Sequence, residues 1–474
     1  MPYQLLAPEI LVASLGLIIL MAGLLLPPQG QKAAGWLAIC GVLLTLVVVI
    51  RQFSQEAVFF AGIYQVDSYS SFFKLLFLSA AVLIFAMAGR YADWFGRRKS
   101  EWFSFMLFAT LGMMLMASSG DLITLYISLE LMTISFYILS AYLLNDGLSA
   151  EAGLKYLILG ALSSAVLLFG MSLIYASSGS TVFARIYEAL QLLPATPPVL
   201  FAGIILVIAG FGFKMALVPF HMWAPDIYQG APTPVTAYLA VGSKAAAFAA
   251  LLRMLIFALP VEHYDWTSLM AILAAVTIVV GNLIALAQSN VKRLLAYSSI
   301  AQAGYILVGL AAANAYGFKG VLFYAMLYVF SNVGAFAVTA VVETQNGSSD
   351  LGAFSGLAKR APMLAAVMTI CMLSLEGIPP MAGFAGKFYL FSGAIQAGYV
   401  WLAFVGLIMS MVSVYYYLNV SRVMYIGNSN GSQAVAVPLM ARLALAVCVA
   451  GTLLIGIYPE PLLQLAELAV QVLR

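Results

Sequence analysis

The feature that most constrains this chain is a series of apolar runs, each long enough to cross a lipid bilayer, separated by short polar turns. A helical span needs about 20 apolar residues, and these runs are continuous, whereas the strands of a membrane barrel alternate polar and apolar residues. Every backbone polar group in lipid must be paired within the protein, so the runs predict α-helices. The predicted spans are residues 5–26, 35–50, 68–89, 102–118, 122–143, 152–177, 199–222, 231–258, 266–288, 294–312, 317–342, 362–396, 399–421 and 436–458.

The composition supports this fold class. Of the 474 residues, 64% are hydrophobic and only 8% are charged, whereas a soluble domain is about 25% charged. The first run lacks a basic leading segment and contains Glu9, so we expect a retained first helix instead of a cleaved signal peptide. The sequence therefore predicts an all-α polytopic membrane protein, a single domain over residues 1–474 with about fourteen transmembrane helices.

The basic residues predict the orientation of the chain, because cytoplasmic loops carry an excess of lysine and arginine. An even number of crossings returns the chain to its starting side. With both termini outside, twelve basic residues fall inside and five outside, so this orientation is favoured. The inner set is Lys32, Arg90, Arg97, Arg98, Lys99, Lys155, Lys292, Arg293, Lys359, Arg360, Arg422 and Arg442, and the outer set is Arg51, Arg185, Arg253, Lys319 and Arg474.

The four basic residues that belong to neither set, Lys74, Lys214, Lys244 and Lys387, fall within the predicted spans, and so does Glu130. Each such charge at the bilayer centre costs about 2.5–3.5 kcal/mol on insertion scales. Lys74 lies near the outer end of its span, where a lysine can snorkel to the surface. Lys244 lies too deep in its span for that explanation. We therefore expect a functional role for the deeper charges.

Two of the spans are interrupted by proline. The seventh breaks at Pro219, shortly after Lys214, and the twelfth contains Glu376, a Gly-Ile-Pro-Pro segment at 377–380 and then Lys387. The two breaks lie five spans apart, and a five-helix unit must reverse its direction when it is repeated. Interrupted spans at matching positions of two halves are typical of inverted-repeat transporters.

This spacing predicts two inverted five-helix repeats, each with one broken helix. Within the single transmembrane domain we expect three amino-terminal helices, a first repeat, a second repeat facing the opposite way, and a last helix with a tail. The respective limits are residues 1–101, 102–258, 266–421 and 436–474.

The breaks favour proton chemistry. Pro219 removes the hydrogen bond to the Met215 carbonyl, next to Lys214, and non-helical backbone at membrane depth needs protein or a water-filled cavity beside it. Burial disfavours the charged form of a lysine and a nearby carboxylate favours it, so Glu130 near Lys214 would control whether the amine holds a proton. Lys244 would be the central member of a relay and Lys387 the next. His221, Glu376 and Lys74 are candidate accessory residues.

Other chemistry lacks the residues it needs. The two histidines, His221 and His263, and three widely separated cysteines do not form a metal cluster. The segment GFAGKF at 383–388 superficially resembles a phosphate-binding loop, but it lacks the leading glycine and has Phe388 in place of Ser or Thr. We therefore expect no cofactor and no metal in this chain. The end of the chain is predicted to form a surface helix with one polar stripe, comprising Gln464, Glu467, Gln471 and Arg474.

Two segments carry a specific resemblance. HMWAPDIYQGAPTPVTAYLAVGSKAAAFAALLRML (221–255) and QSNVKRLLAYSSIAQAGYILVG (288–309) resemble the antiporter-like subunits of bacterial NADH:quinone oxidoreductase, respiratory complex I. The resemblance covers essentially the whole chain. It implies a hydrated polar axis in the middle of the membrane, carried by Glu130 of the fifth helix, Lys214 of the seventh, Lys244 of the eighth and Lys387 of the twelfth. One sibling subunit has a glutamate at the last of these positions.

The resemblance also implies the function. The chain would be a non-redox membrane-arm subunit in a bacterial plasma membrane, coupling electron transfer elsewhere to proton translocation. NADH, FMN, iron–sulfur clusters and quinone would belong to the complex, and the partners would be other membrane-arm subunits, including sibling antiporter-like subunits, and lipid. Two alternatives stay open: a subunit of a multisubunit cation/proton antiporter, or a membrane scaffold whose buried charges only hold helices together.

Overall fold

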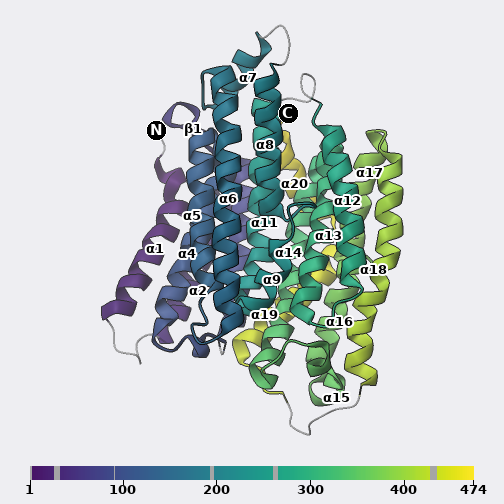
Figure 1. Cartoon of the computed structure of the whole chain (residues 1–474). Coiled ribbons are helices and arrows are strands. Elements are labelled where there is room, and N and C mark those ends of the chain that lie inside the picture. Colours follow the sequence, from purple (N-terminus) through teal and green to yellow (C-terminus); the bar gives the residue numbers. More distant parts are fainter. Residues whose placement is uncertain are drawn as a thin grey trace.

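The computed structural model describes residues 3–25, 32–89, 91–192, 197–259, 265–427 and 435–473. It is a bundle of long helices that run side by side (Figure 1). Within the described ranges, 13 helices are long and apolar enough to cross a membrane. Each overlaps one predicted span, and the one predicted span without such a helix is the twelfth, which is divided into α16 (Pro362–Glu376) and α17 (Ala382–Gln396). The prediction of an all-α polytopic membrane protein is confirmed.

The described elements follow one another in the predicted order. A short antiparallel hairpin of β1 (Ala57–Phe59) and β2 (Tyr64–Val66), which the sequence did not predict, joins the second and third spans. The other elements are η1 (Tyr3–Leu6), α1 (Ala7–Leu25), α2 (Lys32–Gln52), η2 (Phe60–Gly62), α3 (Ser68–Ala88), η3 (Tyr91–Arg98), α4 (Lys99–Ser118), α5 (Leu122–Ser140), α6 (Gly147–Ser178), α7 (Phe183–Gln191), α8 (Pro198–Met215), α9 (Trp223–Gly230), α10 (Thr233–Tyr238), η4 (Leu239–Ser243), α11 (Lys244–Ala258), α12 (Thr267–Ala285), α13 (Val291–Ala311), α14 (Ala315–Asn346), η5 (Leu351–Phe354), α15 (Leu357–Arg360), α18 (Val400–Ile426), α19 (Leu439–Ile457) and α20 (Glu460–Gln471).

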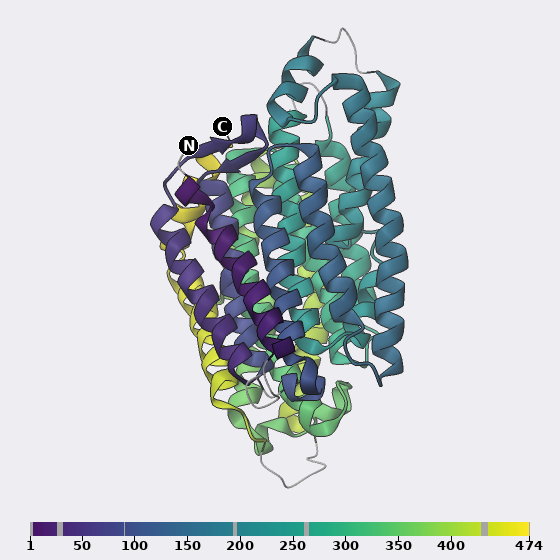
Figure 2. The ribbon, with the colours of Figure 1, turned by 90° about the vertical axis from the view of Figure 1, so that its left-hand side faces the viewer.

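The two ends of the chain lie at the same end of the bundle in both views (Figures 1 and 2). This arrangement requires an even number of crossings, as predicted. The predicted tail helix is α20, with Gln464, Glu467 and Gln471 exposed along one stripe, while Leu463 and Ala466 are buried. Arg474 of the predicted stripe lies outside the described residues, as do Arg90 and His263.

Several features of the predicted first repeat recur in the second. α5 and α13 each begin after a side chain that caps the first turn, Asp121 and Asn290 respectively. α6 and α14 are each 32 residues long, and each ends at a glycine in the left-handed conformation. Each capping residue forms a bridge with a residue just beyond the long helix, Asp121 with Val182 and Asn290 with Asp350. The limits of the repeats stay a prediction, which these recurrences support.

The junction of the seventh and eighth spans differs from the prediction. α8 ends at Met215, before Pro219, and the second half of the broken helix is α9. The predicted span 199–222 therefore missed this second half, because Pro225 and Asp226 interrupt the apolar pattern there. Pro225 is accommodated because it lies in the first turn of α9, where its missing N–H has no helical partner.

Candidate proton-relay site

The first break places Lys214 in the last turn of α8. Ala216 is in the left-handed conformation (φ 58°), and its N–H donates to the Phe213 carbonyl at 2.9 Å. The indole N–H of Trp223 donates to the same carbonyl at 2.8 Å. Within the described ranges, no N–H or O–H donates to the carbonyls of Lys214 and Met215. This agrees with the predicted release of the Met215 carbonyl, and its hydration stays a prediction.

Lys214 and Glu130 are neighbours but do not form a contact ion pair. The buried amine of Lys214 donates to Ser164 Oγ of α6 at 3.1 Å. Glu130 of α5 interacts electrostatically with this amine, and one of its carboxylate oxygens accepts from the Thr133 hydroxyl at 3.4 Å. Its other oxygen is buried and has no hydrogen-bond partner in the described chain. The carboxylate is therefore close enough to influence the lysine without fixing it.

Of the buried lysines, Lys244 lies nearest the middle of the amino-acid sequence. It follows the π-helical turn η4, and single π turns inside α-helices are frequent at functional sites. Its amine donates to the carbonyl and the Oγ of Ser299 at 2.9 and 2.6 Å. The ring centroid of Tyr228 lies 5.8 Å from the same amine. Lys244 is thus buried against neutral groups of α9 and α13.

Polar side chains of α13 connect the central lysine to the second break. Ser299 binds Lys244, and three residues further along the helix Gln302 donates to the Leu375 carbonyl at 2.7 Å and to Tyr417 at 3.2 Å. The sequence pattern did not single out Ser299 and Gln302. The polar spacing within SSIAQAGY, residues 298–305, was the available signal, but hydroxyl and amide side chains are common in membrane helices.

The second break holds Lys387 more tightly than the first holds Lys214. The amine of Lys387 donates to the Glu376 carbonyl at 2.5 Å and to Ser410 Oγ at 3.0 Å. It also lies 4.5 Å from the ring centroid of Tyr305, whose hydroxyl accepts from Ser410 at 3.2 Å. Backbone N–H groups of the break donate to the carbonyls of Leu373 and Ser374 in α16. With Gln302 on the carbonyl of Leu375, all four last carbonyls of α16 are satisfied.

The candidate accessory residues have different surroundings. His221 lies in the first break, is buried, and interacts electrostatically with Lys244, and its Nδ1 has no hydrogen-bond partner in the described chain. Glu376 ends α16 and interacts electrostatically with Lys387. Lys74 instead pairs with Glu9 of α1 at 2.7 Å. Only these first two accessory residues are brought next to axis lysines by the described contacts.

The snorkelling explanation for Lys74 is wrong. Its side chain is only 2% exposed, and the ion pair with Glu9 holds it inside the bundle. A second buried pair lies nearby in the chain, where Arg253 binds both carboxylate oxygens of Asp67 at 2.8 Å. Sequence spacing could not identify these pairs, because each joins different spans.

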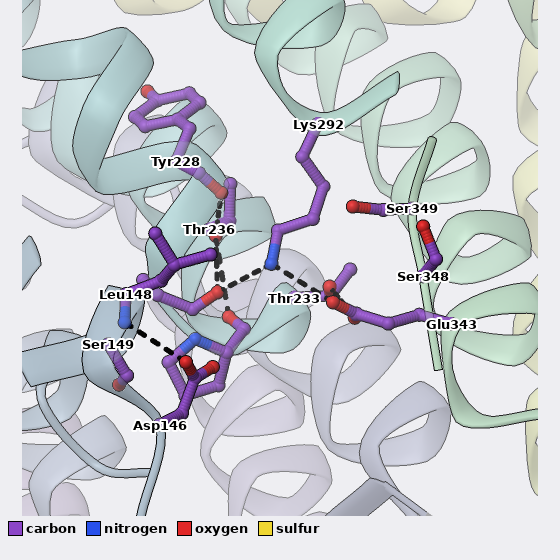
Figure 3. A network of polar contacts seen from close by, with 12 residues as sticks. Asp146, Leu148, Ser149, Tyr228, Thr233, Thr236, Lys292, Glu343, Ser348 and Ser349 are labelled. Atoms are coloured by element: carbon purple, nitrogen blue, oxygen red, sulfur yellow. Dashed lines mark hydrogen bonds and ion pairs between the residues drawn. The ribbon is translucent and has the colours of Figure 1, made fainter. Parts of the chain in front are cut away.

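A further ion pair lies where α9 turns into α10. Lys292 of α13 donates to the Ala231 carbonyl at 2.8 Å and to Glu343 of α14 at 3.2 Å, and Figure 3 shows it pointing toward Glu343 and Thr233. The Thr233 hydroxyl also donates to Glu343. In the next position of α13, Arg293 pairs with Asp226 at 2.7 Å. These contacts join the first predicted repeat to the second.

The described residues thus contain two kinds of buried cation. Lys74, Arg253 and Lys292 are held by carboxylates, whereas Lys214, Lys244 and Lys387 have no carboxylate oxygen within 4.0 Å in the described ranges. No group of three His, Cys, Asp or Glu residues there could hold a metal ion. A helical membrane bundle with a broken helix on either side of a buried lysine is typical of transporters that move protons or other ions across the membrane.

Comparison with known proteins identifies the family. Residues 119–413 match the family described as "NADH:quinone oxidoreductase/Mrp antiporter, TM". The chain is 48% identical over 469 residues to NADH-quinone oxidoreductase subunit N of Desulforamulus reducens, covering 99% of this chain and 98% of the relative. The chain belongs to the NADH:quinone oxidoreductase/Mrp antiporter family. The predicted resemblance is confirmed.

Two solved structures share the fold. A chain of respiratory complex I from Thermus thermophilus with bound aureothin is 36% identical, with a TM-score of 0.82 over 97% of this chain and 99% of that chain. A chain of the Mrp complex from Dietzia sp. DQ12-45-1b has a TM-score of 0.88 over 100% of this chain and 98% of that chain, at 21% identity. The second likeness concerns the fold alone.

Proposed function

We propose that this chain is a non-redox membrane-arm subunit of a proton-translocating NADH:quinone oxidoreductase. It takes part in a translocase reaction as a subunit, while NADH, FMN, iron–sulfur clusters and quinone are bound by other subunits. The similarity to subunit N over nearly the whole chain supports this assignment. Its partners are then the other membrane-arm subunits, sibling antiporter-like subunits among them, together with membrane lipid.

The proton-carrying residues are Glu130, Lys214, Lys244 and Lys387. The observation that carries this proposal is that the three lysines are buried beside hydroxyl and carbonyl oxygens, with no carboxylate of the described residues in contact. Such an amine has no contact ion pair to break when it loses its proton, and the neighbouring hydroxyl can then donate to the neutral amine. His221 and Glu376 adjust the charge near Lys244 and Lys387.

Proton flux tests the proposal. Lys214→Met and Glu130→Gln should each lower proton uptake by inverted membrane vesicles relative to NADH oxidation. The conservative Lys214→Arg keeps a charge but cannot release its proton, so it should lower proton uptake as well. Wild-type proton uptake per NADH oxidised in Lys214→Met or Glu130→Gln would overturn the assignment of these residues.

The chain resides in a bacterial plasma membrane with both termini on the periplasmic side. The excess of basic residues supports this orientation, because α15, which ends in Lys359 and Arg360, lies at the end of the bundle opposite the termini (Figure 1). Labelling of a Gln471→Cys variant by a membrane-impermeant maleimide tests it. Cells with a permeabilised outer membrane should label fully, whereas labelling only in inverted vesicles would reverse the orientation.

A subunit of a multisubunit cation/proton antiporter is the alternative function, and the family description, which names the Mrp antiporter as well, supports it. The two functions differ in the partners they require. Purification of the tagged chain in mild detergent should recover NADH-oxidising subunits and quinone reductase activity. Recovery of antiporter subunits without NADH oxidation would favour the alternative.

A further inference from the structure

A pocket of about 220 Å³ opens at the end of the bundle opposite the termini, between the amino-terminal helices and α19. Its apolar wall is formed by Ile39 of α2, Phe85 of α3, Phe103 of α4 and Met440 of α19. The lysine axis described above contributes none of the residues that line it. The pocket therefore needs a separate explanation.

The mouth of this pocket carries residue types that are common where a bilayer meets water. Trp36 lines it and is 56% exposed, and Trp94 of η3 is 44% exposed. Tryptophan is enriched at membrane–water interfaces because its ring is apolar and its N–H is polar. Charged Asp93 and Lys99 line the same mouth. An apolar depth below a charged, tryptophan-flanked mouth matches the arrangement of a phospholipid, with its acyl chain below its headgroup.

The charges at the mouth select the headgroup. Asp93 and Lys99 are in contact, and their side chains are 64% and 18% exposed. The pair is balanced, so an anionic headgroup would meet the Asp93 carboxylate as well as the lysine. A headgroup that carries both charges can place its phosphate on Lys99 and its ammonium on Asp93. A primary ammonium can donate hydrogen bonds to the carboxylate, which a quaternary one cannot.

The exposed face of α2 provides a continuation for the acyl chain. The pocket is smaller than the roughly 300–1,000 Å³ of sites that enclose a whole small molecule, so it takes only the upper part of a chain. Beyond it, Leu43, Val47 and Ile50 are exposed along α2, toward the other end of the helix. These positions recur every three or four residues and so form one continuous apolar stripe.

We propose that this pocket is a binding site for a phospholipid with a zwitterionic ethanolamine headgroup. Lys99 holds the phosphate, Asp93 holds the ammonium, and the upper acyl chain fills the space between α2, α3, α4 and α19. The lipid thereby connects the amino-terminal helices to the last spanning helix. This site does not depend on the proposed proton path.

Native mass spectrometry of the full-length chain, titrated with ethanolamine, choline and glycerol phospholipids of identical acyl chains, tests the proposal. The wild type should bind the ethanolamine lipid about tenfold more tightly than the other two, the effect expected of one hydrogen bond to a charged group. Asp93→Asn should remove that preference and favour the anionic glycerol lipid, because Lys99 is then unpaired. Lys99→Gln should weaken binding of the ethanolamine lipid.

The control is Glu188→Gln, an exposed carboxylate of α7 at the other end of the bundle, which should leave all affinities unchanged. Equal affinities for the three lipids, or an unchanged preference in Asp93→Asn, would overturn the proposal. A photoreactive residue in place of Ile39 tests the occupant in the intact complex. It should cross-link to phospholipid, and an adduct with a neighbouring subunit or a second copy of the chain would also overturn the proposal.

Discussion

The buried cations outside the predicted relay and those within it differ in their partners. Lys74 pairs with Glu9 at 2.7 Å, Arg253 with Asp67 at 2.8 Å and Lys292 with Glu343 at 3.2 Å; these three pairs connect different spans. The relay lysines instead bind the hydroxyls of Ser164, Ser299 and Ser410. An ion pair resists loss of its proton, because deprotonation leaves a buried carboxylate uncompensated. The difference distinguishes cations that stabilise the fold through ion pairs from lysines that can release a proton.

The two breaks differ in a related way. The last four carbonyls of α16 are all satisfied, two of them by the side chains of Gln302 and Lys387. In α8, the carbonyls of Lys214 and Met215 receive no donor from the described residues. Non-helical backbone at membrane depth requires protein or water around it. We therefore expect water to enter at the first break more readily than at the second.

The largest effect is expected from Lys244→Met, which removes the central relay charge while keeping an unbranched side chain. Proton transfer by a positioned side chain contributes about 10²–10⁴-fold, so proton uptake per NADH oxidised should fall by at least that lower factor. The measurement uses inverted vesicles, with the amount of assembled complex determined on native gels. Reduced assembly with unchanged uptake per complex would instead support the scaffold function.

Glu9→Gln tests the other class of cation. It leaves Lys74 buried without its carboxylate, and breaking a buried pair costs about 3–5 kcal/mol. The thermal midpoint of the purified complex should fall, while proton uptake per assembled complex stays at the wild-type level. The double variant Glu9→Gln with Lys74→Met removes both charges and should recover most of the lost stability. A loss of coupling in Glu9→Gln without destabilisation would place this pair in the proton path.

Much of the fold could be predicted from the sequence, because a chain in lipid must pair its backbone polar groups internally and therefore forms helices. Every long apolar run became helical, the twelfth as two helices, and Lys214, Lys244 and Lys387 stood out because charge is rare in such runs. The candidate residues of the second break were equally visible. The identity of each ion-pair partner was not, since Glu9 and Lys74 meet only after two helices have packed together.

The uncharged polar residues of the candidate site could not be predicted from the sequence either. Ser299 and Gln302 carry the contacts between Lys244 and the second break, but uncharged polar residues do not stand out in a span. α9 falls between two predicted spans, because its sequence WAPDIYQG contains a proline and an aspartate. Its helical form depends on packing, including the stacking of Trp223 on Tyr156 with ring centroids 4.9 Å apart. Contacts of this kind have no local signal in the sequence.

Gln302→Leu tests whether proton transfer depends on the satisfied carbonyls of the second break. The change leaves the buried Leu375 carbonyl without its donor, at a cost of about 1–3 kcal/mol. A lower thermal midpoint and a reduced proton uptake per NADH oxidised are expected together, because Lys387 binds the adjacent carbonyl. Thr339→Val is the control, since among the described residues that hydroxyl bonds only to the Ala335 carbonyl of its own helix, α14. Unchanged stability and coupling in Gln302→Leu would show that the two breaks are functionally alike.

The smallest effects are expected from removing the hydroxyls beside the outer two relay lysines. Ser164 is the only hydrogen-bond acceptor of the Lys214 amine within the described chain, whereas Ser410 shares the Lys387 amine with the Glu376 carbonyl. One hydrogen bond contributes about 1 kcal/mol, or roughly fivefold in an equilibrium. Ser164→Ala should therefore reduce proton uptake per NADH oxidised about fivefold, and Ser410→Ala by less. A larger loss of uptake in Ser410→Ala than in Ser164→Ala would contradict this expectation. The number of hydrogen bonds to each lysine would then not predict which break conducts protons.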